Sequence, residues 1–518
     1  MSFNKIIKHW RWLTLAALFW LIAIPYIPHE FIDLGGDSAQ YIILAESLSQ
    51  GKGLRMANYP GEPLSFYYPP VFPLLLYPIV YFLGRNFYIM HFLVAILGYG
   101  SLRILYLTLK QYDKQAAFPA VCLLAANWIF FLYSTNYILS DIPYLFFTSI
   151  TILLSHQYIR KESALNKKGA LLILGLLLTY FTRFIGITLF FGLTLLLIIT
   201  RREDKFKKLL FIGAVFAAAC AFWNAAKSLQ PAQAHSHFRQ LFLIDPYAPE
   251  KGSLFANPIY FILRFAQGAE YYYRLFADIF SLSILKASTA TKECLSGFVF
   301  GLTFLGLWHK FRENKECVIH YYFIFYFLLI IYWPFREGVR FIVPILPFIF
   351  FYFLAGLKNI LSFLRKRFSL PAFYLFAGTL FVFAVLNLKQ VTAHVSTHNY
   401  SGLPKPHQHF ILIHRWIKEN LPQDGIIISR KPTITYFYTN RKAIVYPFSS
   451  KPQDIWQEAV KNKIKYILAD EFSRETYFYL LPFLSQYGNK LKLLHRIGET
   501  GLFELINDDA RFGEAGIS

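Results

Sequence analysis

Long apolar runs separated by short basic clusters constrain the fold of this chain more than any other feature of its sequence. Of its residues, 56% are hydrophobic, a share that few soluble globular proteins of 518 residues reach. The runs expected to cross a membrane are residues 13–27, 87–109, 116–133, 142–159, 170–182, 186–200, 209–226, 294–309, 318–333, 341–357 and 370–388. We therefore predict an α-helical polytopic membrane protein with about eleven transmembrane helices, some of them tilted because they are short.

The basic clusters predict the sidedness of these helices. With eleven crossings, all six clusters fall on one side, and by the positive-inside rule that side is the cytoplasm. The clusters are Lys5/Lys8/Arg11, Lys110/Lys114, Arg160/Lys161/Lys167/Lys168, Arg201/Arg202/Lys205/Lys207/Lys208, Lys310/Arg312/Lys315 and Arg365/Lys366/Arg367. The N-terminus would then be cytoplasmic and the C-terminus extracytoplasmic, in a multi-pass protein of the cell (inner) membrane. The outer segments would be 29–86, 134–141, 183–185, 227–293, 334–340 and 389–518.

One apolar segment does not fit this scheme. Residues 69–84 are apolar enough to cross, but a crossing there would invert every later loop. Because the segment holds four prolines, we expect an interfacial helix pair instead.

The composition changes after Lys389. Strand-like runs occur at 425–429, 443–446, 465–469 and 491–495, with helical patterns at 408–420 and 452–462. We therefore predict two domains: a transmembrane domain, 1–389, whose first outer loop is 29–86, and an extracytoplasmic α/β domain, 390–518, with a frayed polar tail after Asn507.

The net charge of +22 does not indicate nucleic-acid binding, because the basic residues lie in short clusters that suit anionic lipid. The four cysteines show neither a disulfide framework nor a zinc spacing. The first apolar run has no small-residue cleavage site after it, so we expect it to be retained as a span.

Asp37 is the first candidate for chemistry. It follows two glycines in the first outer loop, where the backbone can approach a ligand closely. The same residue opens the helical pattern 39–48, so an ordinary helix cap explains it equally well. Tyr41 lies one turn further on, and Tyr67 and Tyr68 precede a Pro-Pro pair whose alternative reading is an interfacial aromatic belt.

A second carboxylate and three arginines lie at the outer ends of predicted spans. Asp141 precedes Pro143 and could also be a helix cap. Arg183 interrupts an apolar stretch, so two short helices should meet there, and the arginine should face a polar cavity, a carboxylate or a phosphate. Arg336 and Arg340 could pair with Glu337 or lipid headgroups, or hold a phosphate ester.

Six histidines in the outer regions raise the question of a metal: His235, His237, His394, His398, His407 and His409. No carboxylate partner is placed by spacing, so we assign them no metal and predict no cofactor, with a divalent metal kept as the alternative.

Taken in order, these features resemble the GT-C fold of integral-membrane glycosyltransferases. The order is span, Gly-Asp-x-x-x-Tyr, Pro-Pro with an aromatic neighbour, an acidic residue opening span four, Thr-Arg, Arg-Phe-x-x-Pro and an outer α/β domain. The chain is most similar to the bacterial branch related to protein O-mannosyltransferases and lipid A aminoarabinose transferases. In the outer domain the similarity lies in Trp416–Asn420, before a strand, and in Tyr438–Lys442.

The resemblance implies roles for several residues. Asp37 matches the catalytic acidic residue of the first loop, and Asp141 matches the second acidic residue of the same cavity. Arg340, with Arg183 and Arg336, matches residues near the carrier phosphate. In aminoarabinose transferases a Glu-Lys pair before the Pro-Pro serves a metal and the phosphate. Tyr67 and Tyr68 stand there in this chain, so the resemblance implies neither that metal nor the aminoarabinose donor. We expect these two tyrosines, with Tyr41, to contact the substrate or the carrier phosphate.

The implied reaction is the inverting transfer of a single sugar from a polyprenyl-phosphate carrier to an extracytoplasmic acceptor. Asp37 would accept the proton of the attacking hydroxyl, and arginines would stabilise the leaving phosphate. The expected partners are the lipid-linked donor, a glycan, lipid or protein acceptor, and membrane lipid, with no nucleic acid. The alternatives are a transporter or flippase of a lipid-linked substrate, for which no internal repeat is visible, and an oligosaccharide ligase.

Overall fold

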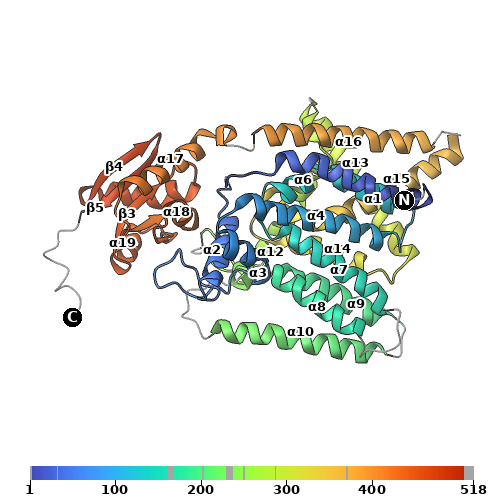
Figure 1. Ribbon diagram of the computed structural model, residues 1–518, viewed down its shortest axis with the longest axis horizontal. Coiled ribbons are helices and arrows are strands. Elements are labelled where there is room, and N and C mark those ends of the chain that lie inside the picture. Colours follow the sequence, from blue (N-terminus) through green and yellow to red (C-terminus); the bar gives the residue numbers. More distant parts are fainter. Residues whose placement is uncertain are drawn as a thin grey trace. The chain divides into compact units, whose positions relative to one another are not determined.

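The computed structural model is mostly helical and carries a small sheet in its C-terminal part (Figure 1). It describes residues 3–31, 33–159, 167–200, 204–228, 237–248, 251–285, 287–368, 372–397 and 400–506. Contacts divide the chain into two compact units. The helical unit contains Met1–Phe31, Phe66–Leu241 and Asn257–Ser396, and the α/β unit contains Ile32–Ser65, Phe242–Ala256 and Thr397–Ser518.

In the helical unit, helices follow one another along almost the whole chain. They are α1 (Phe3–Ala23), η1 (Ile24–Tyr26), α3 (Val71–Leu83), α4 (Phe87–Leu109), α5 (Ala117–Ala126), α6 (Trp128–Thr135), α7 (Asp141–Ile159), α8 (Lys167–Thr182), η2 (Phe184–Gly186), α9 (Ile187–Ile199), α10 (Lys205–Ser228), α12 (Ile259–Ile279), η4 (Leu282–Ile284), α13 (Thr289–Glu313), α14 (Val318–Tyr332), η5 (Gly338–Ile345), α15 (Leu346–Phe368) and α16 (Ala372–Thr397). A short helix, α11 (His237–Phe242), ends where the second piece of the α/β unit begins.

Each predicted apolar run coincides with a helix or a helix pair. Four stretches of helix in the described residues are long and apolar enough to cross a membrane: Phe87–Leu109, Lys205–Ser228, Thr289–Glu313 and Gly338–Leu364. The bent pair α5–α6 would make a fifth. The chain is thus a multi-pass membrane protein, whereas the count of eleven crossings and their orientation stay predictions.

Two predicted runs are interrupted within the helical unit. The run at 116–133 is bent by 62° between α5 and α6. Asn127 sits at this bend: its side-chain oxygen accepts from the backbone N–H of Ile129 and Phe130, and its amide donates to Ile279 O at 2.9 Å. An N-cap at that position starts a new helix.

The second interruption, at Arg183, was expected, and α8 ends immediately before it. The structure of the segment 69–84 differs from the predicted helix pair. It forms one helix, α3, rather than a pair, because Pro78 is accommodated inside it and the helix ends only at Gly84, whose φ is +61°.

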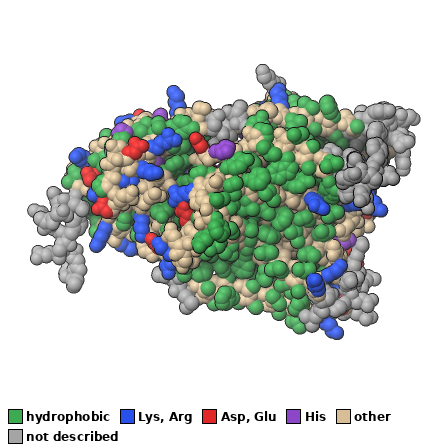
Figure 2. Space-filling view, in the orientation of Figure 1, with side chains coloured by type: hydrophobic (Ala, Val, Ile, Leu, Met, Phe, Trp, Pro, Cys, Tyr) green, Lys and Arg blue, Asp and Glu red, His purple; other side chains and the backbone are tan. Residues whose placement is uncertain are grey.

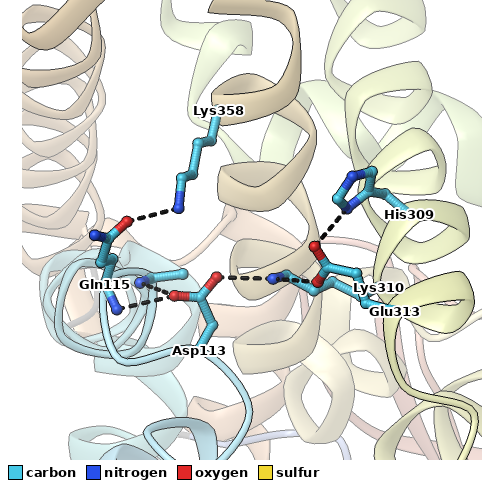
Figure 3. A network of polar contacts seen from close by, with 7 residues as sticks. Asp113, Gln115, His309, Lys310, Glu313 and Lys358 are labelled. Carbon is cyan, nitrogen blue, oxygen red and sulfur yellow. Dashed lines mark hydrogen bonds and ion pairs between the residues drawn. The ribbon is translucent and has the colours of Figure 1, made fainter. Parts of the chain in front are cut away.

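Helices α13 and α15 approach very closely, and a polar network lies where α13 ends. A Cβ at Gly306 would collide with the backbone carbonyl of Tyr352, so glycine is required there. Lys310 of α13 donates to Asp113 and Glu313, each at 2.8 Å (Figure 3). This network joins the end of α13 to the loop between α4 and α5, on the side predicted to be cytoplasmic.

Apolar and charged side chains gather on different parts of the surface. Figure 2 shows a continuous field of hydrophobic side chains over the helices, while Lys, Arg, Asp and Glu cluster over the sheet-containing part. Helix α10 illustrates the first kind of surface, since Phe206, Leu210 and Phe222 are all more than 70% exposed. An exposed apolar surface of this extent suits contact with lipid.

The α/β unit is built on a five-stranded sheet of order β2-β1-β3-β5-β4. Strands β2, β1 and β3 are parallel, and β5 runs antiparallel to both β3 and β4. The strands are β1 (Ile426–Ser429), β2 (Ala443–Ile444), β3 (Ile464–Ala469), β4 (Leu491–Ile497) and β5 (Thr500–Leu505). The helices are α2 (Asp37–Ser49), η6 (Tyr400–Gly402), α17 (Lys405–Asn420), α18 (Pro432–Thr439), α19 (Pro452–Lys461), the π-helical turn η7 (Thr476–Leu480), α20 (Leu481–Gln486) and η8 (Gly488–Lys490).

The four predicted strands and two predicted helices of this unit are present, and β5, α18 and α20 are among the additional elements. Arg441 ties the unit together, since its buried guanidinium donates to Pro422 O, Thr439 O and Leu421 O. The predicted tail after Asn507 lies outside the described residues. The predicted domain boundary at 389 and 390 stays a prediction, while contacts group part of the first loop with the C-terminal residues.

Candidate functional site

The chemistry-bearing side chains of the helical unit centre on Asp141. Its carboxylate is fully buried and accepts hydrogen bonds from two arginines, from Arg183 Nη1 and from Arg340 Nε at 3.2 Å. Both guanidinium side chains are themselves mostly buried, with exposed fractions of 14% and 13%. The structure thus brings together three of the residues that the sequence singled out.

Three different elements hold this cluster in place. Asp141 is the first residue of α7. Arg183 lies in the break between α8 and η2, with extended backbone angles (φ −150°, ψ 129°). Arg340 belongs to η5. The residue after it, Phe341, accepts a hydrogen bond at its backbone carbonyl from the hydroxyl of Tyr326. The helix break expected at Arg183 therefore serves to direct its guanidinium toward a carboxylate, one of the three partners predicted for it.

Two cationic side chains share one buried carboxylate in this cluster. The guanidinium groups of Arg183 and Arg340 both face the buried carboxylate of Asp141, and Glu337 lies 3.8 Å from Arg340 and is 44% exposed. Buried arginines are costly unless anionic groups compensate their charge. The cluster is therefore suited to an anionic ligand with several oxygen acceptors, such as a phosphate.

Arg336 has a clear structural task. Its Nη1 donates to the carbonyls of Ile330, Ile331 and Trp333, the last of these at 2.6 Å. Arg336 thus donates to carbonyls at the C-terminal end of α14, where the last carbonyls of a helix lack intrahelical partners. The structure thus explains Arg336 as a helix cap, and its predicted role at the carrier phosphate stays a prediction.

Tyr67 and Tyr68 also belong to the helical unit, just before α3. Their rings pack edge to face with centroids 5.2 Å apart, and both are half-buried. Pro70 is the N-cap residue of α3. The aromatic and proline motif thus begins a helix, and contact between its tyrosines and a substrate stays a prediction.

Asp37 opens α2 in the α/β unit. The N-cap of that helix is Gly36, with φ +101°, and Asp37 is the first helical residue. The local turn is held by Asp33 instead, whose carboxylate accepts from Gly35 N at 2.7 Å and from the Ser38 hydroxyl. Asp37 is therefore not the N-cap residue; it is half-buried and lies in the first turn of α2, at the positive end of the helix dipole.

Helix α2 is anchored to the C-terminal residues of the same unit. The hydroxyl of Thr433 donates to Gln40 Oε1 at 3.2 Å, and Asn58 O accepts from Ala443 N at 2.9 Å. Tyr41 is buried within this packing, only 4% exposed. The backbone that carries Asp37 is therefore held by the folded α/β unit.

The described histidines of the outer regions each have their own contacts. His407 stacks on Phe472, His409 bonds to Glu471 at 2.6 Å, and His394 stacks on Trp128. His235 and His398, and the side chain of His237, lie outside the described residues. No group of three His, Cys, Asp or Glu side chains in the described part of the chain could hold a metal ion.

Sequence reasoning missed several charged residues that the structure places in contact. Arg430 pairs with Glu475 at 3.0 Å and lies against the rings of Tyr247 and Phe448. Lys442 pairs with Glu62 of the first loop. The one available signal was that Lys442 belongs to the motif Tyr438–Lys442; nothing in the sequence indicated its partner.

Comparison with known proteins identifies the type of fold. A family model described as dolichyl-phosphate-mannose-protein mannosyltransferase matches residues 68–224. The structure is similar to ArnT from Cupriavidus metallidurans bound to undecaprenyl phosphate, with a TM-score of 0.58 and 12% identity over 97% of this chain and 98% of that chain. The chain has the GT-C fold.

The GT-C fold is shared with a second solved structure. The archaeal oligosaccharyltransferase AglB from Archaeoglobus fulgidus, in complex with an inhibitory peptide and a dolichol-phosphate, matches with a TM-score of 0.55 and 15% identity, over 90% of this chain and 70% of that chain. No curated protein matches the sequence. The resemblance inferred from the order of motifs is thus confirmed at the level of the GT-C fold.

Proposed function

We propose that this protein is a glycosyltransferase that moves a single sugar from a polyprenyl-phosphate carrier to an acceptor outside the cytoplasm. The observation that supports it most is the pairing of buried Asp141 with Arg183 and Arg340. The two structural relatives were solved with undecaprenyl phosphate and dolichol-phosphate, which are lipid phosphates of the kind such a cluster could hold.

In this proposal the arginines bind the phosphate and Asp141 positions them. A carboxylate that bonds to both guanidinium groups fixes their orientation for the binding of phosphate oxygens. As the bond between the anomeric carbon and the phosphate oxygen breaks, negative charge grows on the phosphate. Fixed guanidinium groups stabilise that charge without reorganising, so the leaving group needs no proton.

Asp37 acts as the general base in this proposal. The hydroxyl oxygen of the acceptor attacks the anomeric carbon from the face opposite the phosphate, and its proton passes to the Asp37 carboxylate. Configuration at the anomeric carbon is thereby inverted. A positioned base contributes about 10²–10⁴ in rate. The first turn of α2 places this carboxylate at the positive end of the helix dipole.

The proposed orientation places the α/β unit outside and the N-terminus in the cytoplasm. Its support is the six basic clusters of the sequence, which share one side under eleven crossings. A lipid-linked donor suits a site outside the cytoplasm, because the donor's phosphate lies at the membrane surface. The reaction then needs no soluble nucleotide sugar.

Two experiments in sequence test the proposed activity. Mass spectrometry of envelope glycans from cells with and without the protein should reveal one missing sugar residue and its acceptor. Purified protein supplied with that sugar on polyprenyl phosphate should then transfer it with inversion at the anomeric carbon. Transfer of a whole preassembled glycan would instead indicate an oligosaccharide ligase. Movement of the lipid-linked sugar across a vesicle membrane without transfer would indicate a flippase.

A further inference from the structure

A basic groove lies in the α/β unit, in the part of the first loop that follows α2. Its volume is about 600 Å³. The residues that line it are Gly51, Lys52, Arg55, Gly61, Glu62 and Lys442. Three cationic side chains and one carboxylate therefore face a single concavity whose size falls in the range of small-ligand sites.

The wall of the groove is a tight loop attached to the sheet. Backbone hydrogen bonds join Met56 N to Pro63 O at 2.8 Å and Ser65 N to Leu54 O at 2.7 Å. The bond from Ala443 N to Asn58 O attaches the tip of the loop to β2, directly after Lys442. Loop and strand thus form one structure that fixes where the groove's charges lie.

The backbone of this loop is unusual where it lines the groove. Gly51 and Gly61 have φ of +71° and +73°, and a Cβ at either would meet open space. Glu62 has φ +45°, a left-handed conformation that non-glycine residues rarely adopt. A non-glycine residue keeps such a conformation only where the surrounding structure enforces it. Residues of this kind cluster at active sites and ligand clamps.

The charged side chains are held ready for an anion. Arg55 is fixed by two backbone carbonyls, since its Nη1 donates to Glu62 O at 2.9 Å and its Nε to Lys52 O at 3.2 Å. Those bonds use two of its five N–H groups. The Glu62 carboxylate bridges Lys52 and Lys442 at 3.2 and 3.3 Å. Three positive charges against one negative charge leave a net charge of about +2 across the groove.

We propose that this groove binds an anionic glycan, a saccharide that bears carboxylate or phosphate groups and forms part of the acceptor. The ligand's anionic group takes the place of Glu62 as partner of the two lysines and meets the fixed guanidinium of Arg55. The groove is open, and its volume of about 600 Å³ accommodates one charged sugar unit. This inference rests on the proposed glycosyl transfer.

The groove's place along the chain suggests the size of that acceptor. Helix α2 carries Asp37 at its first residue and Ser49 at its last, and its 13 residues span about 20 Å. The groove begins just beyond the far end of the helix, more than one sugar ring away from Asp37. The acceptor is therefore an oligomer, whose remote acidic unit supplies binding energy for orienting the reacting hydroxyl.

Binding measurements on the full-length protein test this proposal without requiring activity. The protein would be placed in nanodiscs of zwitterionic lipid and titrated with an oligogalacturonate, with a neutral oligosaccharide of equal length and with inorganic phosphate. The test variants are Lys52→Ala/Lys442→Ala and Glu62→Gln. Because both lysine side chains are substantially exposed, 44% and 39%, their loss should leave the fold intact.

A matched control removes the same charge from the same unit. The pair Lys461→Ala/Lys492→Ala alters two exposed lysines that do not line the groove. We expect the groove pair to weaken oligogalacturonate binding by roughly tenfold or more, since each lost cation removes charge-assisted bonds. The control pair should stay within about twofold, and Glu62→Gln should tighten binding, the opposite sign to the lysine variants.

Several outcomes would overturn the proposal. They are equal weakening by the control pair, equal affinity for the neutral oligosaccharide, or inorganic phosphate binding as tightly as the acidic glycan. An effect seen only on vesicles of anionic lipid would indicate a membrane contact instead. The Asp37→Asn variant should bind the glycan like the unaltered protein, so loss of transfer activity and loss of glycan binding remain distinguishable.

Discussion

Replacing Asp141 by asparagine should destabilise the helical unit strongly. The substitution keeps the size of the side chain and one oxygen acceptor, but it removes the buried negative charge that faces Arg183 and Arg340. Both arginines would remain in place, 14% and 13% exposed, without the buried charge that they share.

The size of the effect follows from the burial of all three groups. Breaking a buried ion pair by removing one partner costs about 3–5 kcal/mol, because the remaining charge stays desolvated. Glu337 offers a matched comparison in the same cluster. It lies 3.8 Å from Arg340 and is 44% exposed, so Glu337→Gln should cost less than about 1 kcal/mol.

The double variant Asp141→Asn/Arg183→Gln measures how much the contact between these two side chains contributes to stability. If the two side chains stabilise each other, the double variant should lose less stability than the sum of the single variants, by about 0.5–3 kcal/mol. The assay is equilibrium unfolding of the purified protein in mixed micelles, followed by tryptophan fluorescence, with the two single variants and Glu337→Gln measured in parallel.

Two results would refute this reasoning. If Asp141→Asn unfolds at the same denaturant concentration as Glu337→Gln, the buried carboxylate does not compensate the arginines. If the losses of the two single variants simply add, the contact with Arg183 contributes nothing. In transfer assays Asp141→Asn should reduce activity less than Asp37→Asn, since Asp141 acts through the arginines; an equal reduction would mean that the roles of the two carboxylates are confused.

Two further predictions concern pH and topology. Burial lowers the pKa of His414 from 6.5 to about 4, and its ring bonds to Phe410 O and Thr435 Oγ1 as a neutral imidazole. Below pH 6.5 the unfolded chain therefore binds a proton that the folded chain does not, so the free energy of unfolding should rise by about 3 kcal/mol from pH 4 to pH 6.5. In His414→Phe, the plot of this free energy against pH should lack that rise. An unchanged pH dependence in the variant would contradict the prediction. Reporters fused after residue 400 should be active only outside the cytoplasm, and a cytoplasmic signal would overturn the proposed orientation.

Much of the helical architecture could be predicted from the sequence, because apolar length and basic flanks act locally. The run at 87–109 coincides with α4, and the break at Arg183 was expected from a charge inside an apolar stretch. The bend at Asn127 was not expected. A polar side chain within an apolar run gives no sign that it will cap a new helix and bond to residues 152 and 260 positions away.

The partners within the candidate site were harder to predict than its members. Asp141, Arg183 and Arg340 were all singled out, yet 42 and 199 residues separate the arginines from the carboxylate that they share. Sequence periodicity carries no information over such distances. The same limit applies to Lys442 and Glu62, and it explains why the first loop's grouping with the C-terminal sheet residues could not be read from the sequence.

The transfer rate of Asp37→Asn tests the central claim most directly. The substitution leaves the size of the side chain and the start of α2 unchanged, because Gly36 is the cap. Its matched control is Asp33→Asn in the same loop, where the carboxylate holds the local turn. With the sugar on polyprenyl phosphate as donor, we expect Asp37→Asn to lose about 10²–10⁴ in rate while folding normally, and Asp33→Asn to keep most of its activity. Full activity of Asp37→Asn would contradict the proposed mechanism.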